Sequence, residues 1–135
     1  MANALYGKGR EAILAAQIDW VGTDMRIIIV DLTDYTLLID ADDNLDDVGA
    51  SGTVAESSNL STKTETLGVA DADNVTFSSV TGDACDYVIG FEETGTENTS
   101  QLIFNIDTAS GIPVTPNGGD ITVTWDNGSD KIFKL

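Results

Sequence analysis

Five aspartates lie within eight residues of this chain, at positions 40, 42, 43, 46 and 47. Carboxylate oxygens are ligands that calcium prefers, so the segment is a candidate metal site. An EF-hand loop that begins at Asp40 needs a glycine at its sixth position and a glutamate at its twelfth, where this chain has Leu45 and Ser51. The segment therefore predicts a solvated acidic loop over Asp40 to Asp47, and a calcium site of another geometry is the alternative hypothesis.

Catalytic side chains are scarce. The chain has no histidine, which excludes Ser-His and Cys-His pairs. The single cysteine, Cys85, stands beside Asp86 with no neighbouring base, and we predict that it is a small, partly buried strand residue. Glu92 and Glu93 are adjacent, and adjacent strand residues point to opposite faces, so they do not form a glycosidase pair. We predict that the protein is not an enzyme and carries no cofactor.

Charge is the most unusual property of the composition. The 135 residues include 23 acids and six bases, which gives a net charge of −17. Such a field repels phosphate and anionic lipid, and it keeps a protein soluble at high copy number. Neither nucleic acid nor a membrane surface is an expected partner, because both attract clustered Lys and Arg. The lone cysteine and the short apolar run near the start predict a protein made in a reducing cytoplasm.

One short helix is expected near the start of the chain. The segment 10–20, "REAILAAQIDW", places Leu14 and Ile18 on one helical face and Glu11 in the first turn. Tyr6 and Trp20 flank this segment, and we predict that they pack it onto the rest of the domain, with contact to a partner as the alternative.

Three of the six bases, Lys8, Arg10 and Arg26, gather in the first quarter of the chain. Two interpretations stay open. They form a local positive region that receives the acidic surface of a partner, or they balance the acids beside them.

The rest of the chain indicates β-structure. The run "MRIIIVDL" (25–32) is typical of a strand buried on both faces, a second short strand is expected at 35–39, and residues 40–52 are expected to form a loop. Short runs separated by turn residues then predict further strands: "TVAES", "TKTETLG", "NVTFSSV", "DYVIGFEE", "SQLIFNI", "DITVTW" and "KIFKL". We predict an all-β, antiparallel fold, a sandwich or barrel, in one domain over 1–135, with the segment 1–20 packed on it.

The last two runs suggest a hairpin. A loop at Asn127 to Ser129 would place Trp125 opposite Lys131, Val123 opposite Phe133 and Ile121 opposite Leu135, with all these side chains on one face. Since register follows the hydrophobic face, this pairing is preferred over one shifted by a residue.

Three phrases resemble a family of small structural proteins of tailed bacteriophages. They are the opening "MANALYGKGREAIL" with "IDW", the segment "DADNVTFSSVTGD" and the close "GIPVTPNGGDITVTWDNGSDKIF". The resemblance implies a component of the virion, and in particular a capsid cement or decoration protein with a β-sandwich or jelly-roll fold. It brings no catalytic or metal-binding residue. The segment 40–58 resembles the family least.

The expected function is therefore that of a cement protein on the outer capsid surface, made in the cytoplasm of the bacterial host. Its expected partners are the major capsid protein and itself, as a homodimer or homotrimer. The expected contact residues are Leu5, Tyr6 and Arg10. Two alternatives stay open: a tail or head-fibre module that binds a host receptor or glycan, and a calcium-dependent carbohydrate binder that uses the loop at 40–47.

Overall fold

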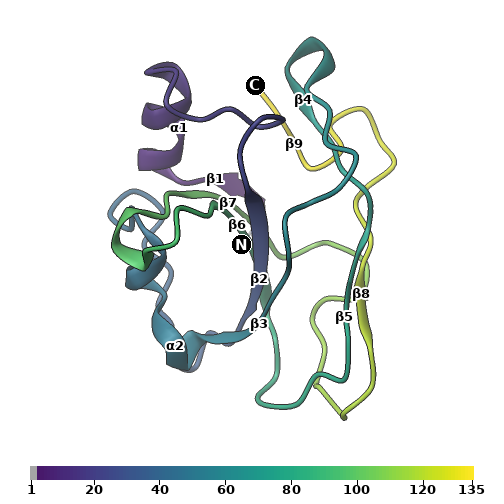
Figure 1. Ribbon diagram of the computed structural model, residues 1–135. Coiled ribbons are helices and arrows are strands. Elements are labelled where there is room, and N and C mark those ends of the chain that lie inside the picture. Colours follow the sequence, from purple (N-terminus) through teal and green to yellow (C-terminus); the bar gives the residue numbers. More distant parts are fainter. Residues whose placement is uncertain (1–2) are drawn as a thin grey trace.

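The computed structural model describes residues 3–135, and its regular elements are mostly strands (Figure 1). The predicted domain and its N-terminal segment begin at residue 1, and residues 1–2 lie outside the described residues. The strands are β1 (Ala4–Leu5), β2 (Met25–Val30), β3 (Thr53–Glu56), β4 (Val69–Ala70), β5 (Val75–Phe77), β6 (Tyr87–Glu92), β7 (Leu102–Ile106), β8 (Ile121–Val123) and β9 (Phe133–Lys134). The helices are α1 (Gly7–Leu14), α2 (Gly49–Gly52) and the short 3-10 helices η1 (Leu45–Asp47), η2 (Thr66–Gly68) and η3 (Glu97–Thr99).

Five strands form one antiparallel sheet in the order β1-β7-β6-β2-β3. Its centre is the pair β2 and β6, which match along their whole length from Met25 opposite Glu92 to Val30 opposite Tyr87. Five of the six residues of β2 are buried, which confirms the prediction of a strand covered on both faces. Within the described residues, β1 and β3 are the two edges of this sheet.

Two hydrophobic cores lie on opposite faces of the large sheet. Alternation along β2 sends Ile27 and Ile29 into the first core and Ile28 and Val30 into the second. The first core joins the large sheet to the small sheets β4-β9 and β5-β8, and the second lies on the side of α1 and α2 (Figure 1). The structure thus confirms a mainly β, antiparallel fold with a short N-terminal helix.

The predicted C-terminal hairpin is wrong. β8 pairs with β5, with Val75 opposite Val123 and Phe77 opposite Ile121, while β9 pairs with β4, with Ala70 opposite Phe133. Ile121 and Val123 are nevertheless buried, as expected for this face. The buried face was therefore read correctly for β8. In the last run it was not, because Ile132 is buried and Leu135 is 64% exposed. The partner strands were also wrong, because the true partners β5 and β4 lie far away in the sequence.

The helix is shorter and earlier than the segment 10–20. Its close fit to β7 depends on Gly9, where a Cβ atom would lie 2.7 Å from the carbonyl oxygen of Leu102. Leu14 is 89% exposed, so the predicted apolar face is wrong at this position, and the helix buries Gly9 and Ala12 instead. Glu11 lies beyond the first turn and forms an ion pair with Lys8.

Two expected strands are also absent. Residues 35–39 and 62–68 contain no strand, and the second stretch ends in η2, while the expected loop at 40–52 contains η1 and α2. In the second stretch, only Thr64 pairs with another segment, in an isolated bridge to Asp71 within the described chain. Across residues 3–135, every helix is too short or too polar to traverse a lipid bilayer.

Candidate functional site

The three expected contact residues are neighbours, but they differ in exposure. Leu5 is half-buried in the edge strand β1, and Arg10 is exposed on α1. The Arg10 guanidinium donates through Nη1 to the carbonyl oxygen of Leu5 at 2.8 Å and lies 3.3 Å from Oδ1 of Asp40. Tyr6 is fully buried, so its side chain does not reach a partner in this conformation. Contact through Leu5 and Arg10 stays a prediction.

Tyr6 belongs to a buried chain of hydrogen bonds in the second core. Its hydroxyl lies 2.9 Å from the Tyr35 hydroxyl, which donates to Oδ2 of Asp42 at 2.6 Å. The same carboxylate oxygen accepts the amide of Leu38 at 2.9 Å. Burial, followed by the bond to Asp42, raises the pKa of Tyr35, and burial also raises the pKa of Tyr6. The prediction that Tyr6 and Trp20 pack inside the domain is confirmed, since both side chains are buried.

The acidic segment does not act as one unit. Asp42 is buried in that hydrogen-bond chain, whereas Asp43, Asp46 and Asp47 can bring carboxylate oxygens within 4.8 Å of one another. Asp47 already caps η1, because its Oδ2 accepts the amides of Asp43 at 2.8 Å and Asn44 at 3.3 Å. Local backbone bonding accounts for this cluster, and calcium binding stays an untested hypothesis.

A second group of acids is formed by Asp31, Asp34 and Asp83, whose carboxylate oxygens also lie within 4.8 Å of one another. Asp31 is buried and accepts bonds from the amide and hydroxyl of Thr33, each at 2.7 Å. These bonds lower the pKa of Asp31. This group could not be predicted from the sequence, because Asp83 lies about fifty residues from the other two in the chain.

Cys85 is fully buried, where partial burial in a strand was expected, and it lies before β6 in an isolated bridge to Val114 with backbone bonds of 2.8 and 3.0 Å. Burial, together with the negative charges of Asp86 and Asp31, raises the pKa of its thiol to about 11. A neutral, buried thiol is a poor nucleophile.

Four of the six bases are held by neighbouring groups. Lys8 pairs with Glu11 at 2.8 Å, Arg10 with Asp40, and Arg26 with Asp24 and Glu56, both at 3.0 Å. Lys63 donates to the carbonyl oxygen of Thr23 and to Asn59. The N-terminal bases therefore balance nearby acids. Among residues 3–135, Lys131 and Lys134 form no ion pair.

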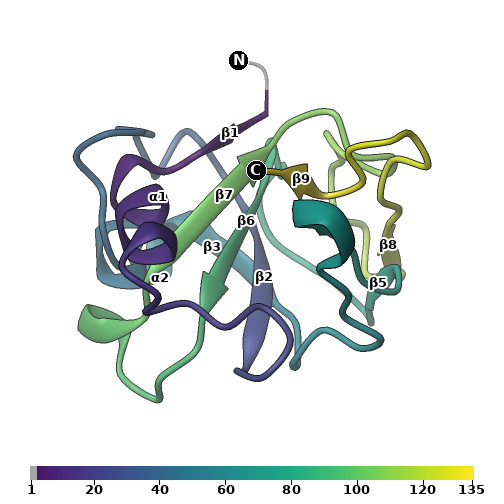
Figure 2. The same cartoon turned by 90° about the horizontal axis from the view of Figure 1, so that it is seen from above.

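One end of the molecule carries exposed apolar side chains. Large apolar residues that are strongly exposed include Leu14 (89%), Leu67 (91%), Leu135 (64%) and Val21 (45%). The end of α1, the turn before β4 and the C terminus all lie at the top of Figure 1 and face the viewer in Figure 2, with the C terminus between the other two. The amide of Leu135 donates to the carbonyl oxygen of Gly68 at 3.0 Å, which joins the C terminus to the turn before β4, and the ring of Trp20, in the loop after α1, lies 5.4 Å from that of Phe133. We call Leu14, Val21, Leu67 and Leu135 the leucine end.

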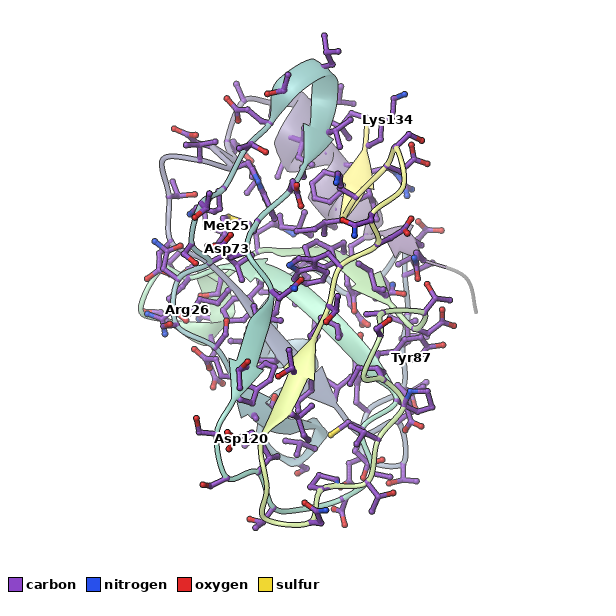
Figure 3. The ribbon with its side chains drawn as sticks, turned by 90° about the vertical axis from the view of Figure 1, so that its right-hand side faces the viewer. Met25, Arg26, Asp73, Tyr87, Asp120 and Lys134 are labelled. Atoms are coloured by element: carbon purple, nitrogen blue, oxygen red, sulfur yellow. The ribbon has the colours of Figure 1, made fainter. Side chains whose placement is uncertain are left out.

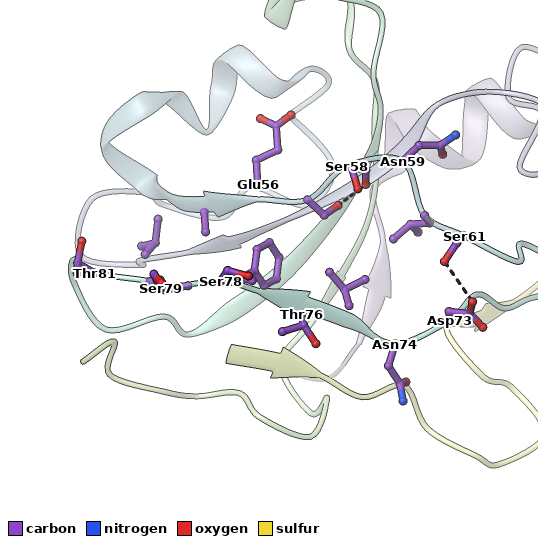
Figure 4. Close-up of a pocket in the computed structure, with 17 residues that line it drawn as sticks. Glu56, Ser58, Asn59, Ser61, Asp73, Asn74, Thr76, Ser78, Ser79 and Thr81 are labelled. Atoms are coloured by element: carbon purple, nitrogen blue, oxygen red, sulfur yellow. Dashed lines mark hydrogen bonds between the residues drawn. The ribbon is translucent and has the colours of Figure 1, made fainter. Parts of the chain in front are cut away.

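Two grooves open beside the edges of the large sheet. The first, the hydroxyl groove, has a volume of about 480 Å³ and runs between residues 54–61, which include β3, and residues 73–81, which include β5 (Figure 4). Its lining is rich in hydroxyl and amide groups, namely Ser57, Ser58, Asn59, Ser61, Asn74, Thr76, Ser78, Ser79 and Thr81. Such a lining suits polar ligands that donate and accept hydrogen bonds.

The second groove, the edge groove, has a volume of about 560 Å³ and lies between β1 and the C-terminal residues 130–134. Figure 3 shows this side of the molecule, with Lys134 labelled on the yellow C-terminal segment. Aromatic rings form part of its lining: Phe104 lies 6.2 Å from Trp125 and 5.7 Å from Phe133 between ring centroids. Leu5 is a lining residue, so this groove includes one of the predicted contact residues.

The floor of the edge groove is closely packed against the first core. Gly90 of β6 leaves room for the Phe104 ring, since a Cβ atom there would lie 2.0 Å from that ring.

Comparison with known proteins adds no further constraint: neither protein-family models nor curated protein sequences give a match to this chain.

Proposed function

We propose that this protein is a non-enzymatic structural component of a tailed-bacteriophage particle, a cement protein bound to the outer surface of the capsid shell. Its sequence resemblance at both ends and in the middle supports the phage assignment. The observation that carries the docking role is the leucine end, which concentrates exposed apolar side chains on an otherwise acidic molecule.

Leu67 is the most informative member of this surface. It is 91% exposed and lies in the left-handed region with φ of 56°. This conformation costs a residue with a Cβ atom about 1–2 kcal/mol. The turn before β4 therefore holds an apolar side chain in water at a conformational cost, which a contact surface explains. Full burial of each such leucine against a partner would contribute about 1.5–3 kcal/mol.

The fold fits a role of this kind. We propose that the large sheet and the small sheets β4-β9 and β5-β8 are the two layers of a jelly-roll-like β-sandwich, with the first core between them. The net charge of −17 supports solubility at high copy number before assembly. On a repeating shell, weak contacts made by many copies, or by a homodimer or homotrimer, add up through avidity.

The partner in this proposal is the major capsid protein, and the location is the outer surface of the virion after synthesis in the host cytoplasm. Replacing Leu14 by Gln, Leu67 by Asn and Leu135 by Gln should abolish binding to capsids that lack the protein. Asn tolerates the left-handed region, so the turn keeps its conformation. The matched control is Leu38→Gln, which removes an apolar side chain that is 52% exposed and lies outside the leucine end.

A circular dichroism melt should show that the triple variant and the control are both folded. Capsid binding of the folded triple variant at the natural level would contradict the proposed surface.

A second function is supported by the hydroxyl groove. A tail or head-fibre module would bind a host-surface glycan there, through the hydroxyl and amide groups of its two walls. The test is binding of purified host cell-wall polysaccharide by the natural protein and by Ser78→Tyr, which fills the groove. Ser129→Tyr is the control outside it. Glycan binding that is lost only in Ser78→Tyr would favour this function, and the absence of glycan binding would remove it.

A further inference from the structure

The edge groove is bordered by two strands that each leave one edge unpaired. Within residues 3–135, β1 is an outermost strand of the large sheet, and β9 pairs with β4 alone. Backbone N–H and C=O groups along such edges favour pairing with another extended segment. Both strands contribute lining residues: Ala4 and Leu5 from β1, and Phe133 and Lys134 from β9.

The two edges differ in how they are covered. Arg10 donates to the carbonyl oxygen of Leu5, so a side chain of this chain already occupies a backbone acceptor of β1. On the other wall, no side chain among residues 3–135 hydrogen-bonds to the backbone of Phe133 or Lys134. The edge of β9 is therefore the wall that is open to strand addition.

The lining combines apolar and charged groups in the way that an added strand requires. Side chains of a strand alternate between two faces, so one face of a bound segment would contact the aromatic floor at Phe104 and Phe133. The other face would lie near Lys131 and Lys134, the two lysines without an ion pair in the described chain. Asp126 and Asp130 are also lining residues, and they leave the groove near neutrality on a molecule whose net charge is −17.

We propose that the edge groove binds an extended segment of a different protein, which adds as a strand beside β9 and alternates apolar with acidic side chains. Main-chain hydrogen bonds would supply affinity, while the aromatic floor and the two lysines would select the side chains. A second copy of this chain is a poorer occupant, because pairing through the same edge would set the lysines of one copy against those of the other. This proposal is independent of attachment to a capsid.

The direct test uses purified full-length protein and a fluorescein-labelled peptide of seven alternating glutamates and valines, followed by fluorescence anisotropy. We expect saturable binding. The double variant Lys131→Glu/Lys134→Glu should bind at least about tenfold more weakly. Lys8→Glu is the matched control for charge reversal, because Lys8 is exposed on α1 and is not a lining residue, and it should stay within about twofold of the natural protein.

Two further peptides test the mode of binding. A peptide in which lysine replaces glutamate should not bind, and an acidic peptide with N-methylated valines should lose binding because it lacks the N–H donors that pair with a strand edge. The proposal is overturned by the absence of binding to the acidic peptide, by equal binding of the N-methylated peptide, or by equal binding to the charge-reversed protein. Sedimentation that shows a dimer in the natural protein and a monomer in the double variant would assign the groove to a second copy instead.

Discussion

At the scale of single residues, the chain from Tyr6 through Tyr35 to Asp42 makes a prediction about stability. Tyr35→Phe removes the 2.6 Å bond to the buried Asp42 carboxylate and should cost about 1–3 kcal/mol, because a charged acceptor loses a partner. Tyr6→Phe removes only the bond between two hydroxyls and should cost about 1 kcal/mol. Urea denaturation measures both. A larger loss for Tyr6→Phe would contradict the assignment of Asp42 as the main acceptor.

At Asn105, by contrast, we expect that removal of a polar side chain stabilises the protein. It is fully buried in β7, between Ala4 and Ile89, and among residues 3–135 neither its amide nitrogen nor its amide oxygen has a hydrogen-bond partner. Since an unpaired buried polar group is costly, Asn105→Leu should raise the free energy of unfolding by about 1 kcal/mol. The control is Asn59→Leu, whose amide oxygen accepts the amide of Met25, and which should lower it. Destabilisation by Asn105→Leu in the same urea experiment would show that this amide is satisfied in solution.

Cys85 gives a prediction about pH. Its pKa is about 11 in the folded protein against an ordinary value of 9, so the unfolded chain releases its thiol proton first as the pH rises. The stabilisation that comes from this pKa difference is complete below pH 9 and is lost between about pH 9 and 11, with a size of about 3 kcal/mol. Cys85→Ala should therefore show a smaller fall in unfolding free energy over this range than the natural protein. Identical pH profiles would refute the buried, neutral thiol.

Burial of several of these residues could be predicted from the sequence. Tyr6, Trp20 and Cys85 are buried as expected, because each is a large or weakly polar side chain beside apolar runs. Leu14 is the instructive failure. The prediction that Leu14 and Ile18 share a buried helical face required the helix to extend to Trp20, and the helix ends at Leu14 instead. The pairing of Tyr35 with Asp42 and the gathering of Asp31 with Asp83 depend on the fold of the chain and left no local pattern.

At the scale of elements, the sequence indicated where strands lie but not which strands pair. Periodicity placed β2, β3, β5, β6, β7, β8 and β9 within the expected runs. Register within a hairpin is set by the turn and by the hydrophobic face, whereas the pairs β5-β8 and β4-β9 join segments more than forty residues apart. The expected hairpin was compatible with the turn and with apolar alternation, but β8 and β9 pair with the distant strands β5 and β4 instead.

The pairing can be tested with engineered disulfides in a Cys85→Ala background. Thr76 and Thr122 are directly opposed in β5 and β8, and their hydroxyls lie 2.9 Å apart, so Thr76→Cys/Thr122→Cys should oxidise to a disulfide. The control is Thr122→Cys/Lys134→Cys, because Thr122 and Lys134 would lie opposite each other in the expected hairpin. This pair should stay reduced. Mass spectrometry after alkylation separates the two states. A disulfide in the control alone would restore the hairpin.

At the scale of the whole molecule, an acidic protein carries exposed apolar side chains at one end. Charge keeps free copies apart, while the leucine end offers a surface whose burial favours attachment. The charge follows from the sequence alone, and the resemblance is what motivates the proposed role on a phage particle. The sequence could not reveal the leucine end, because α1, the turn before β4 and the C terminus come to the same end of the molecule only through the fold (Figures 1 and 2).

The most direct measurement of the central claim is titration of the purified protein onto mature capsids that lack it, followed by heating of bare and saturated particles. The account predicts saturation at a copy number that matches the capsid lattice, with DNA released at a higher temperature from the saturated particles than from the bare ones. No binding, or only a few copies per particle with an unchanged release temperature, would contradict a cement function.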